Sequence, residues 1–286
     1  MLRKATVNDF RKHIEFAYSL ALDLETSSYP TYLDGIKTKE DFKERAYRAF
    51  ADGSNEEILI FEYNGRVEGW IHYYVIPEDK YLSFCAFNVS AGMDDAVTEF
   101  IAYARNMYEG YTVHFGFPGE NEQALTALQR VDCRLEETAC VHAIALNAAR
   151  SFQDTECTER VDEASFDDFA ALHAIHDDDM YWNNKRLREA LAEWEIWMLR
   201  DCDGHASAAV YWCEYDQTMM EIFGFDYREN CFNEKSFSNL MIRALNSGKE
   251  HGVANLVYFA SLEECSTLTA LGFRYISRYV LYSCIL

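Results

Sequence analysis

Hydrophobic and polar positions follow one order twice along the chain. In the first half, an apolar run at 58–63, the pair Asn64-Gly65 and a second run at 66–75 predict a β-hairpin. Asn-Gly supplies the positive φ angles of a type I′ turn, which makes this the strongest local signal in that half. In the second half the same pattern returns around Asp203-Gly204, and Asp203 follows Asn64 by 139 positions.

Helical periodicity surrounds both hairpins. Thr38 to Asp41 has the form of a capping box and predicts a helix running toward Phe50. Apolar residues three and four apart predict further helices at 93–108 and 120–131. Their counterparts in the second half are 235–250 and 262–271, and short strands separate these helices.

Three further blocks repeat in the same order. The pairs are Ala5–Phe10 with Ala164–Phe169, Ala86–Val89 with Gly224–Tyr227, and Leu128–Arg134 with Leu268–Arg274. Agreement of four blocks in one order indicates an internal duplication. We therefore expect two copies of one mixed α/β domain, at 1–147 and 160–286, joined by a polar linker near 148–159.

Composition narrows the class of protein. The chain has 286 residues, 26 Lys and Arg against 48 Asp and Glu, and a formal net charge of −22. An acidic surface disfavours nucleic acid, because phosphate contacts need basic side chains. No apolar run reaches the roughly 20 residues of a membrane span, and the first residues do not form a signal peptide. We expect a cytoplasmic protein that contacts no membrane.

The nine cysteines contain no CxxC pair, so we expect reduced thiols in the core and no metal. His173 and His176 could share a helix face, which leaves zinc as an alternative, but no third imidazole or thiolate has ligand spacing.

The element order, the two hairpins and Leu271-Gly272-Phe273 after the last helix make each half resemble an N-acetyltransferase of the GNAT superfamily. The resemblance covers nearly the whole chain, twice. It implies a mostly antiparallel mixed sheet with helices on both faces and a splay between its fourth and fifth strands. It also implies that acetyl-CoA lies in the splay and that a small amine enters from the other side.

The cofactor loop of that family, Q/R-x-x-G-x-G/A, is missing from both halves. The equivalent segment of the first half places Asp94 and Asp95 where a pyrophosphate would bind. Charge therefore favours the second half as the catalytic copy, although Asn121 matches the family only in the first. The resemblance implies the following cofactor contacts: Gly224, Phe225, Asp226, Tyr227, Arg228, Asn233, Lys235 and Ser236.

The tyrosine that commonly serves the family as general acid is replaced by Leu128 and Leu268. Tyr258, with Tyr227 as an alternative, is then the candidate acid in the second half. Glu221 is the candidate general base, on one strand face with Phe223 and Phe225. Each of these residues could instead be a packing residue of the sheet.

Substrate recognition is assigned to the segment that the family places between its first two helices. Asp177, Asp178 and Asp179 precede Tyr181 and Trp182, a combination that favours a cationic amine through charge and cation–π contact. A solvated helix end is the alternative interpretation. For the whole chain, the alternative to an acetyltransferase is a degenerate GNAT-fold protein that binds or acts as a scaffold without catalysis.

Overall fold

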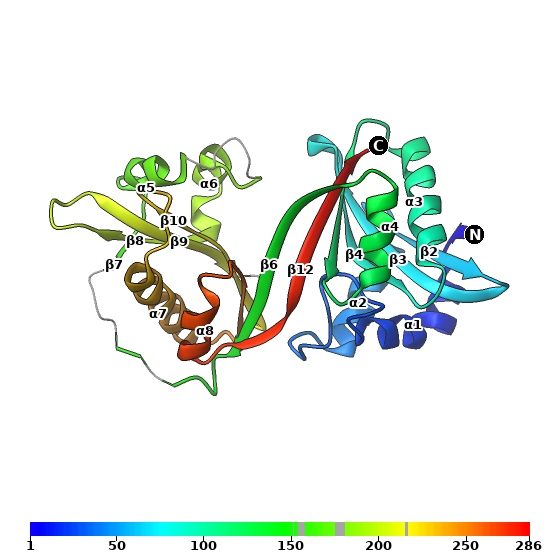
Figure 1. Ribbon diagram of the computed structural model, residues 1–286, viewed down its shortest axis with the longest axis horizontal. Coiled ribbons are helices and arrows are strands. Elements are labelled where there is room, and N and C mark those ends of the chain that lie inside the picture. The colour runs from blue at the N-terminus through cyan, green and yellow to red at the C-terminus, as the bar shows by residue number, and fades with distance from the viewer. Residues whose placement is uncertain (151, 154–157, 175–180, 215–216) are drawn as a thin grey trace. The chain divides into compact units, whose positions relative to one another are not determined.

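The computed structural model describes residues 1–150, 152–153, 158–174, 181–214 and 217–286 (Figure 1). They form two compact units: unit 1 is Met1–Ala139 with Ser277–Leu286, and unit 2 is Cys140–Ile276. The units therefore differ from the contiguous ranges 1–147 and 160–286, because each unit contains a strand from the other half of the chain. Two copies of one mixed α/β architecture are nevertheless present, as the sequence predicts.

Unit 1 contains most of the first copy. Its elements are β1 (Leu2–Lys4), α1 (Val7–Ala21), α2 (Lys39–Arg48), β2 (Glu56–Tyr63), β3 (Arg66–Ile76), β4 (Tyr81–Val89), α3 (Met93–Met107), β5 (Thr112–Pro118), α4 (Glu122–Arg130) and the greater part of β12 (Arg274–Ile285).

Unit 2 repeats this order. Its elements are the end of β6 (Arg134–Ala145), β7 (Thr158–Arg160), α5 (Phe166–His173), α6 (Asn184–Glu189), β8 (Trp194–Arg200), β9 (Ala206–Glu214), β10 (Met219–Tyr227), α7 (Glu234–Glu250), β11 (Asn255–Ala260) and α8 (Cys265–Leu271).

Strand pairing has the same pattern in both units. The order in unit 1 is β1-β2-β3-β4-β5-β12, and the order in unit 2 is β7-β8-β9-β10-β11-β6. Within each unit, the fourth and fifth strands of the described sheet are parallel, β4 with β5 and β10 with β11. The last strand of each unit is exchanged: β12 lies antiparallel to β5, and β6 lies antiparallel to β11.

Both parallel pairs separate after a short contact. Strands β4 and β5 pair only at Tyr81–Thr112 and Leu82–Val113, and β10 and β11 pair only from Met219 to Ile222. Beyond these points each pair diverges, which confirms the splay between the fourth and fifth strands. Such a splay leaves backbone groups on both strands that need other partners.

Helices cover both faces of each sheet (Figure 1). In unit 1, α3 and α4 pack over a core that includes Phe87, Phe100 and Phe115, while α1 and α2 cover Ile60 and Trp70 on the opposite face. In unit 2, α7 and α8 pack over one core and α5 with α6 over another.

Local signals set several element ends. Thr38 caps α2 through the predicted capping box with Asp41, and Asn64-Gly65 has positive φ at both positions. The second hairpin differs, because its loop spans 201–205 and only Gly204 has positive φ. Asp201 organises that loop by accepting bonds from the backbone of Asp203 and His205.

Candidate functional site

The splay of unit 1 is filled by the chain itself. The loop between α1 and α2 enters it: Phe87 N–H donates to Ser28 Oγ at 2.6 Å and Val89 N–H to the Thr26 carbonyl at 3.0 Å. On the other strand, the Tyr29 N–H donates to the Gly116 carbonyl at 2.8 Å. Ser28 is 1 % exposed. The backbone groups that a pantetheine chain would need are thus already paired.

The splay of unit 2 presents the equivalent backbone without such a loop in the described residues. Arg228 N–H donates to Ser207 on β9, so alternation directs the N–H groups of Phe225 and Tyr227 away from β9 and into the splay. Neither N–H group has a hydrogen-bond partner among the residues that the structure describes. An extended amide chain could pair with both.

A β-bulge in β10 changes which residues share a face. Ile222 pairs with Trp212 and Gly224 with Tyr211, so Phe223 is an extra residue. Phe223 packs in the core under α5, whereas Phe225 packs on the α7 side. The expectation that Glu221, Phe223 and Phe225 lie on one face is therefore wrong for Phe225. Glu221, half-buried and paired with Cys213, shares the α5 side with Phe223.

An aromatic series continues from the bulge on the α5 side. Phe223 contacts Trp194 with ring centroids 4.8 Å apart, and Trp194 contacts Trp182 at 4.8 Å. Tyr181, 44 % exposed, follows at 5.4 Å from Trp182. The guanidinium of Arg186 lies 3.9 Å from the Tyr181 ring centre, so the chain itself supplies a cation there.

The remaining substrate residues of the prediction, Asp177, Asp178 and Asp179, lie outside the described residues. The same holds for His176, so the structure describes only His173 of the alternative zinc pair.

Tyr258 lies on the α7 side of the splay, where its strand pairs with Ile222 for the last time before the divergence. Its hydroxyl donates to both carboxylate oxygens of Glu264 at 3.0 Å. Burial and the neighbouring Glu264 raise the pKa of Tyr258 well above its usual value, and burial raises the pKa of Glu264. The pair holds a buried proton beside the splay.

The start of α7 carries the predicted pyrophosphate contacts. Asn233 caps the helix by accepting from the Ser236 N–H at 2.9 Å, and Lys235 in the first turn is exposed. Arg228 is directed elsewhere, because its guanidinium bonds to Asp201 and to the Ala206 carbonyl. Asn233, Lys235 and Ser236 are thus together at one helix end, whereas the Arg228 side chain is bound at the β8–β9 turn.

Two other predicted cofactor residues, Gly224 and Asp226, are fixed by contacts on the α5 side of the sheet. A Cβ on Gly224 would overlap the hydroxyl of Tyr211, so only glycine fits there. Asp226 is 2 % exposed and bonds to His173 Nδ1 at 2.9 Å on the α5 side. From Asp226 only the backbone lies along the splay.

The start of α3 in unit 1 has the opposite electrostatic character. A pocket of about 500 Å³ lies there, and Asp94, Asp95 and Glu122 are among its lining residues. Arg130 also lines it but is ion-paired to Asp94. Three carboxylates at two helix starts disfavour a pyrophosphate, in line with the charge argument from sequence.

Sequence reasoning missed three features. It did not find the loop 26–29 in the unit 1 splay or Glu264 beside Tyr258, because both depend on contacts that no periodicity encodes. It also missed a cluster of Glu56, His72 and Cys85 on three neighbouring strands. The register of strands β2, β3 and β4 places the three side chains on one face of the sheet, but only if Cys85 is the extra residue of a bulge.

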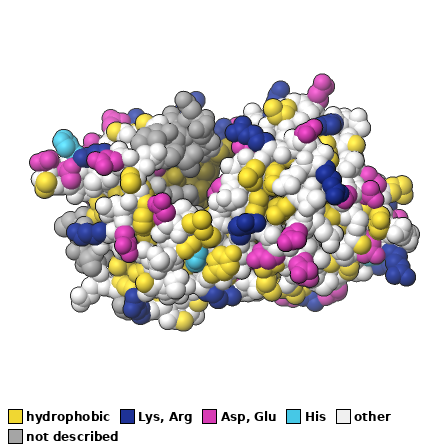
Figure 2. Space-filling view, in the orientation of Figure 1, with side chains coloured by type: hydrophobic (Ala, Val, Ile, Leu, Met, Phe, Trp, Pro, Cys, Tyr) yellow, Lys and Arg dark blue, Asp and Glu magenta, His cyan; other side chains and the backbone are white. Residues whose placement is uncertain are grey.

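Charge on the surface is mixed. On the face shown in Figure 2, the described Asp and Glu side chains are interspersed with Lys and Arg. Within the described ranges, no helix has both the length and the apolar character that crossing a bilayer requires.

No family model matches the chain, and no curated protein matches its sequence. Solved structures do match its fold. A GCN5-related N-acetyltransferase from Sphaerobacter thermophilus is 14 % identical with a TM-score of 0.62, covering 99 % of this chain and 95 % of that one. A tandem GNAT protein from the clavulanic acid biosynthesis pathway is 10 % identical with a TM-score of 0.50, covering 99 % and 98 %.

The N-myristoyltransferase of Saccharomyces cerevisiae, solved with myristoyl-CoA, is 9 % identical with a TM-score of 0.50, covering 99 % of this chain and 77 % of that one. The chain therefore has the fold of GCN5-related N-acetyltransferases. It is a tandem form of that fold, with one copy in each half of the sequence.

Proposed function

We propose that the protein transfers an acetyl group from acetyl-CoA to a small amine, with unit 2 as the catalytic copy. The observation that carries the proposal is the difference between the two splays. Residues 26–29 already occupy the splay backbone of unit 1, whereas Phe225 and Tyr227 direct their N–H groups into the splay of unit 2 without a described partner. An amide-bearing pantetheine chain is a suitable partner for those groups.

The pyrophosphate would lie at the start of α7. The backbone N–H groups of the first turn and the exposed Lys235 are suited to an anion, although Glu234 in the same turn offsets part of the positive charge. Asn233 and Ser236 would fix this turn through their capping bond.

The two faces of the sheet divide the chemistry. Glu221 on the α5 side would take a proton from the ammonium of the acceptor, and the free amine would attack the thioester carbonyl. As the new C–N bond forms and the C–S bond breaks, the Tyr258 hydroxyl on the α7 side would protonate the CoA thiolate. Glu264, which accepts the Tyr258 hydrogen bond, would orient that hydroxyl.

The acceptor in this proposal is a small cationic amine. Its recognition would rest on Asp177, Asp178 and Asp179 together with the aromatic series that ends at Trp182 and Tyr181. Arg186 over the Tyr181 ring makes Trp182 the better aromatic partner for a second cation.

Calorimetric titration of acetyl-CoA tests the assignment of the cofactor. We expect measurable binding to the wild type, a loss of about tenfold or more in Lys235→Glu, and little change in Asp94→Lys, which makes a charge change of the same size at the other copy. The opposite ranking would assign the cofactor to unit 1. A dissociation constant far above millimolar in the wild type would support the alternative, a GNAT-fold protein without catalysis.

Turnover tests the two catalytic roles. With an amine that the enzyme accepts, Glu221→Gln should lower kcat most at low pH, where the amine is protonated, and Tyr258→Phe should lower kcat at unchanged acetyl-CoA affinity. Full activity in both variants would contradict the roles assigned to these residues.

A further inference from the structure

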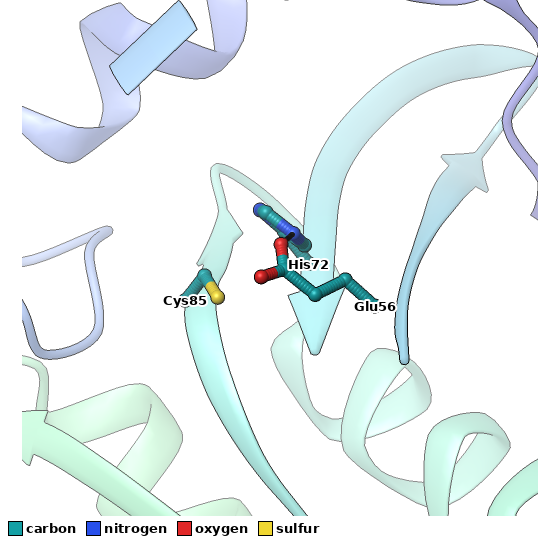
Figure 3. A group of neighbouring side chains, drawn as sticks. All are labelled: Glu56, His72 and Cys85. Carbon is teal, nitrogen blue, oxygen red and sulfur yellow. Dashed lines mark hydrogen bonds and ion pairs between the residues drawn. The ribbon is translucent and has the colours of Figure 1, made fainter. Parts of the chain in front are cut away.

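A cluster of charged and nucleophilic side chains lies in unit 1, apart from the proposed acetyl-transfer site. Glu56 on β2, His72 on β3 and Cys85 on β4 direct their side chains toward one another (Figure 3). One ligand-type atom from each lies within 4.8 Å of the others. Cys85 is the extra residue of a bulge, because Phe84 pairs with Tyr73 and Ala86 with His72.

Arg45 on α2 completes the cluster. Its Nε and one terminal nitrogen each donate to the Cys85 sulfur at 3.3 Å, and it lies 2.9 Å from Glu56. His72 Nε2 lies 2.8 Å from the other Glu56 oxygen. The guanidinium and the imidazole therefore each contact Glu56, and the guanidinium also contacts the sulfur.

The donors that converge on Cys85 have the geometry that suits an anionic acceptor. A neutral thiol is a weak acceptor, whereas a thiolate accepts strong bonds from a guanidinium fork. Burial opposes a charged imidazole, but the contacts with Cys85 and Glu56 outweigh it and raise the pKa of His72. With the proton on His72, two cations alternate with two anions around the cluster. The tyrosines Tyr32 and Tyr74 also face Cys85.

Zinc would use the same residue types, but Arg45 argues against it. The guanidinium already contacts both of the anionic groups that would bind the metal. A second cation would have to displace it. Acyl-CoA is also a poor reactant for this sulfur, because residues 26–29 fill the splay of unit 1.

We propose that Cys85 is a reactive thiolate and a site of oxidation by hydroperoxides. Cys85 is a buried residue with 9 % of its surface exposed, and the Arg45 side chain that contacts its sulfur is 40 % exposed, so in this proposal a small oxidant reaches the sulfur along the guanidinium. The thiolate attacks one peroxide oxygen, an S–O bond forms, and the O–O bond breaks. The departing hydroxide or alkoxide takes the His72 proton as water or alcohol, and Cys85 becomes a sulfenic acid.

Thiol labelling of the full chain, followed by peptide mass spectrometry, tests the proposal. Cys133 is a control for burial alone, because it is 8 % exposed and lies in the same unit, whereas its contact with Cys284 raises its pKa and makes it an ordinary unreactive thiol. We expect iodoacetamide at pH 7 to label Cys85 about tenfold or more faster than Cys133, and dimedone to trap Cys85 after hydrogen peroxide. Equal labelling of the two residues would overturn the proposal.

Variants of Arg45 distinguish an ionised Cys85 from a neutral thiol that the reagent simply reaches more easily. Arg45→Met keeps an apolar stem, opens the same side and should slow Cys85 labelling about tenfold at pH 7. Arg45→Lys keeps the charge without the fork and serves if the Met variant does not fold. A labelling rate that stays the same or rises in both variants contradicts an ionised sulfur.

A zinc titration distinguishes the metal alternative. If one equivalent of Zn²⁺ binds at micromolar concentration, protects Cys85 from iodoacetamide and fails to bind to His72→Gln, the cluster is a metal site and the thiolate proposal falls. We expect no such protection.

Discussion

Cys85 in unit 1 and Phe223 in unit 2 occupy the same place in the repeat, since each is the extra residue of a bulge in the fourth strand. The backbone is alike at this point, but the chemistry differs. Cys85 has Arg45, His72 and Glu56 as neighbours, whereas Phe223 packs on Trp194. One duplicated bulge thus supports a polar cluster in one copy and an aromatic wall in the other.

The bond from Phe87 to Ser28 should contribute to the stability of unit 1. Ser28→Ala leaves the Phe87 N–H without its partner in a buried strand, and we expect a loss of about 1–3 kcal/mol in the free energy of unfolding by urea. Ser19→Ala, which removes an exposed hydroxyl bond on α1, should change the same quantity by less than about 0.5 kcal/mol. Equal effects of the two substitutions would mean that the loop does not stabilise the splay.

Gly224 should tolerate no side chain while Tyr211 is present. Gly224→Ala would overlap the Tyr211 hydroxyl and should destabilise unit 2 by about 1–3 kcal/mol. Tyr211→Phe in the Gly224→Ala background removes the nearest atom and should recover part of the loss, although the ring carbon Cζ still lies only 2.8 Å from the new Cβ. A double-mutant cycle on thermal unfolding measures this coupling, and strict additivity would refute it.

The pair of His173 and Asp226 is buried and should be costly to break. His173 also lies 2.9 Å from the Trp182 carbonyl through Nε2, so each ring nitrogen lies within hydrogen-bond distance of an oxygen. His173→Ala leaves a buried carboxylate unpaired, which should cost about 3–5 kcal/mol in denaturant unfolding.

Asp226→Asn supplies the control for that pair. It removes the charge and keeps the shape of the side chain. The equivalent residue of unit 1, Asn88, is already an asparagine. Added to His173→Ala, Asp226→Asn should restore part of the lost stability. If the double variant is as unstable as the sum of the single ones, the charge on Asp226 is not the cause.

The stability that the buried carboxyl of Glu264 contributes should decrease as pH rises. Burial raises the pKa of Glu264 above that of the unfolded chain, so the folded state holds this proton more tightly. Its contribution is therefore fully present below the unfolded value of about 4.5 and is lost as pH rises through the folded pKa. The unfolding free energy of wild type relative to Glu264→Gln should fall as pH rises above about 4.5. A relative stability that increases over this range would contradict the prediction.

Sequence patterns predicted the features that depend on neighbouring residues. The Asn64-Gly65 turn and the Thr38 capping box are confirmed, because each is decided within four residues. Period-two reasoning failed in β10 because one inserted residue, Phe223, moves Phe225 to the other face. No local signal marks such an insertion.

Long-range contacts account for the rest. The loop 26–29 is joined by hydrogen bonds to β4, about 60 positions away, and to β5, about 90 positions away. The Arg45 to Cys85 contact joins a helix to a bulge. For the candidate site, the sequence predicted that Asn233, Lys235 and Ser236 lie together at the start of a helix, which is α7. The side-chain partners of Arg228 and Asp226 were not, because both are chosen by tertiary packing.

The exchanged strands affect how the chain can fold during synthesis. In unit 1, Phe115 on β5 needs Tyr282 on β12 as its partner, and a ribosome makes the second residue only after nearly all of unit 2 has emerged. The edge of β5 is therefore open until β12 has been synthesised. At usual elongation rates of roughly 5–20 residues per second, that exposure lasts on the order of ten seconds or more. A nascent chain in this state presents an unpaired strand, which makes it a substrate for chaperones until β12 has been synthesised.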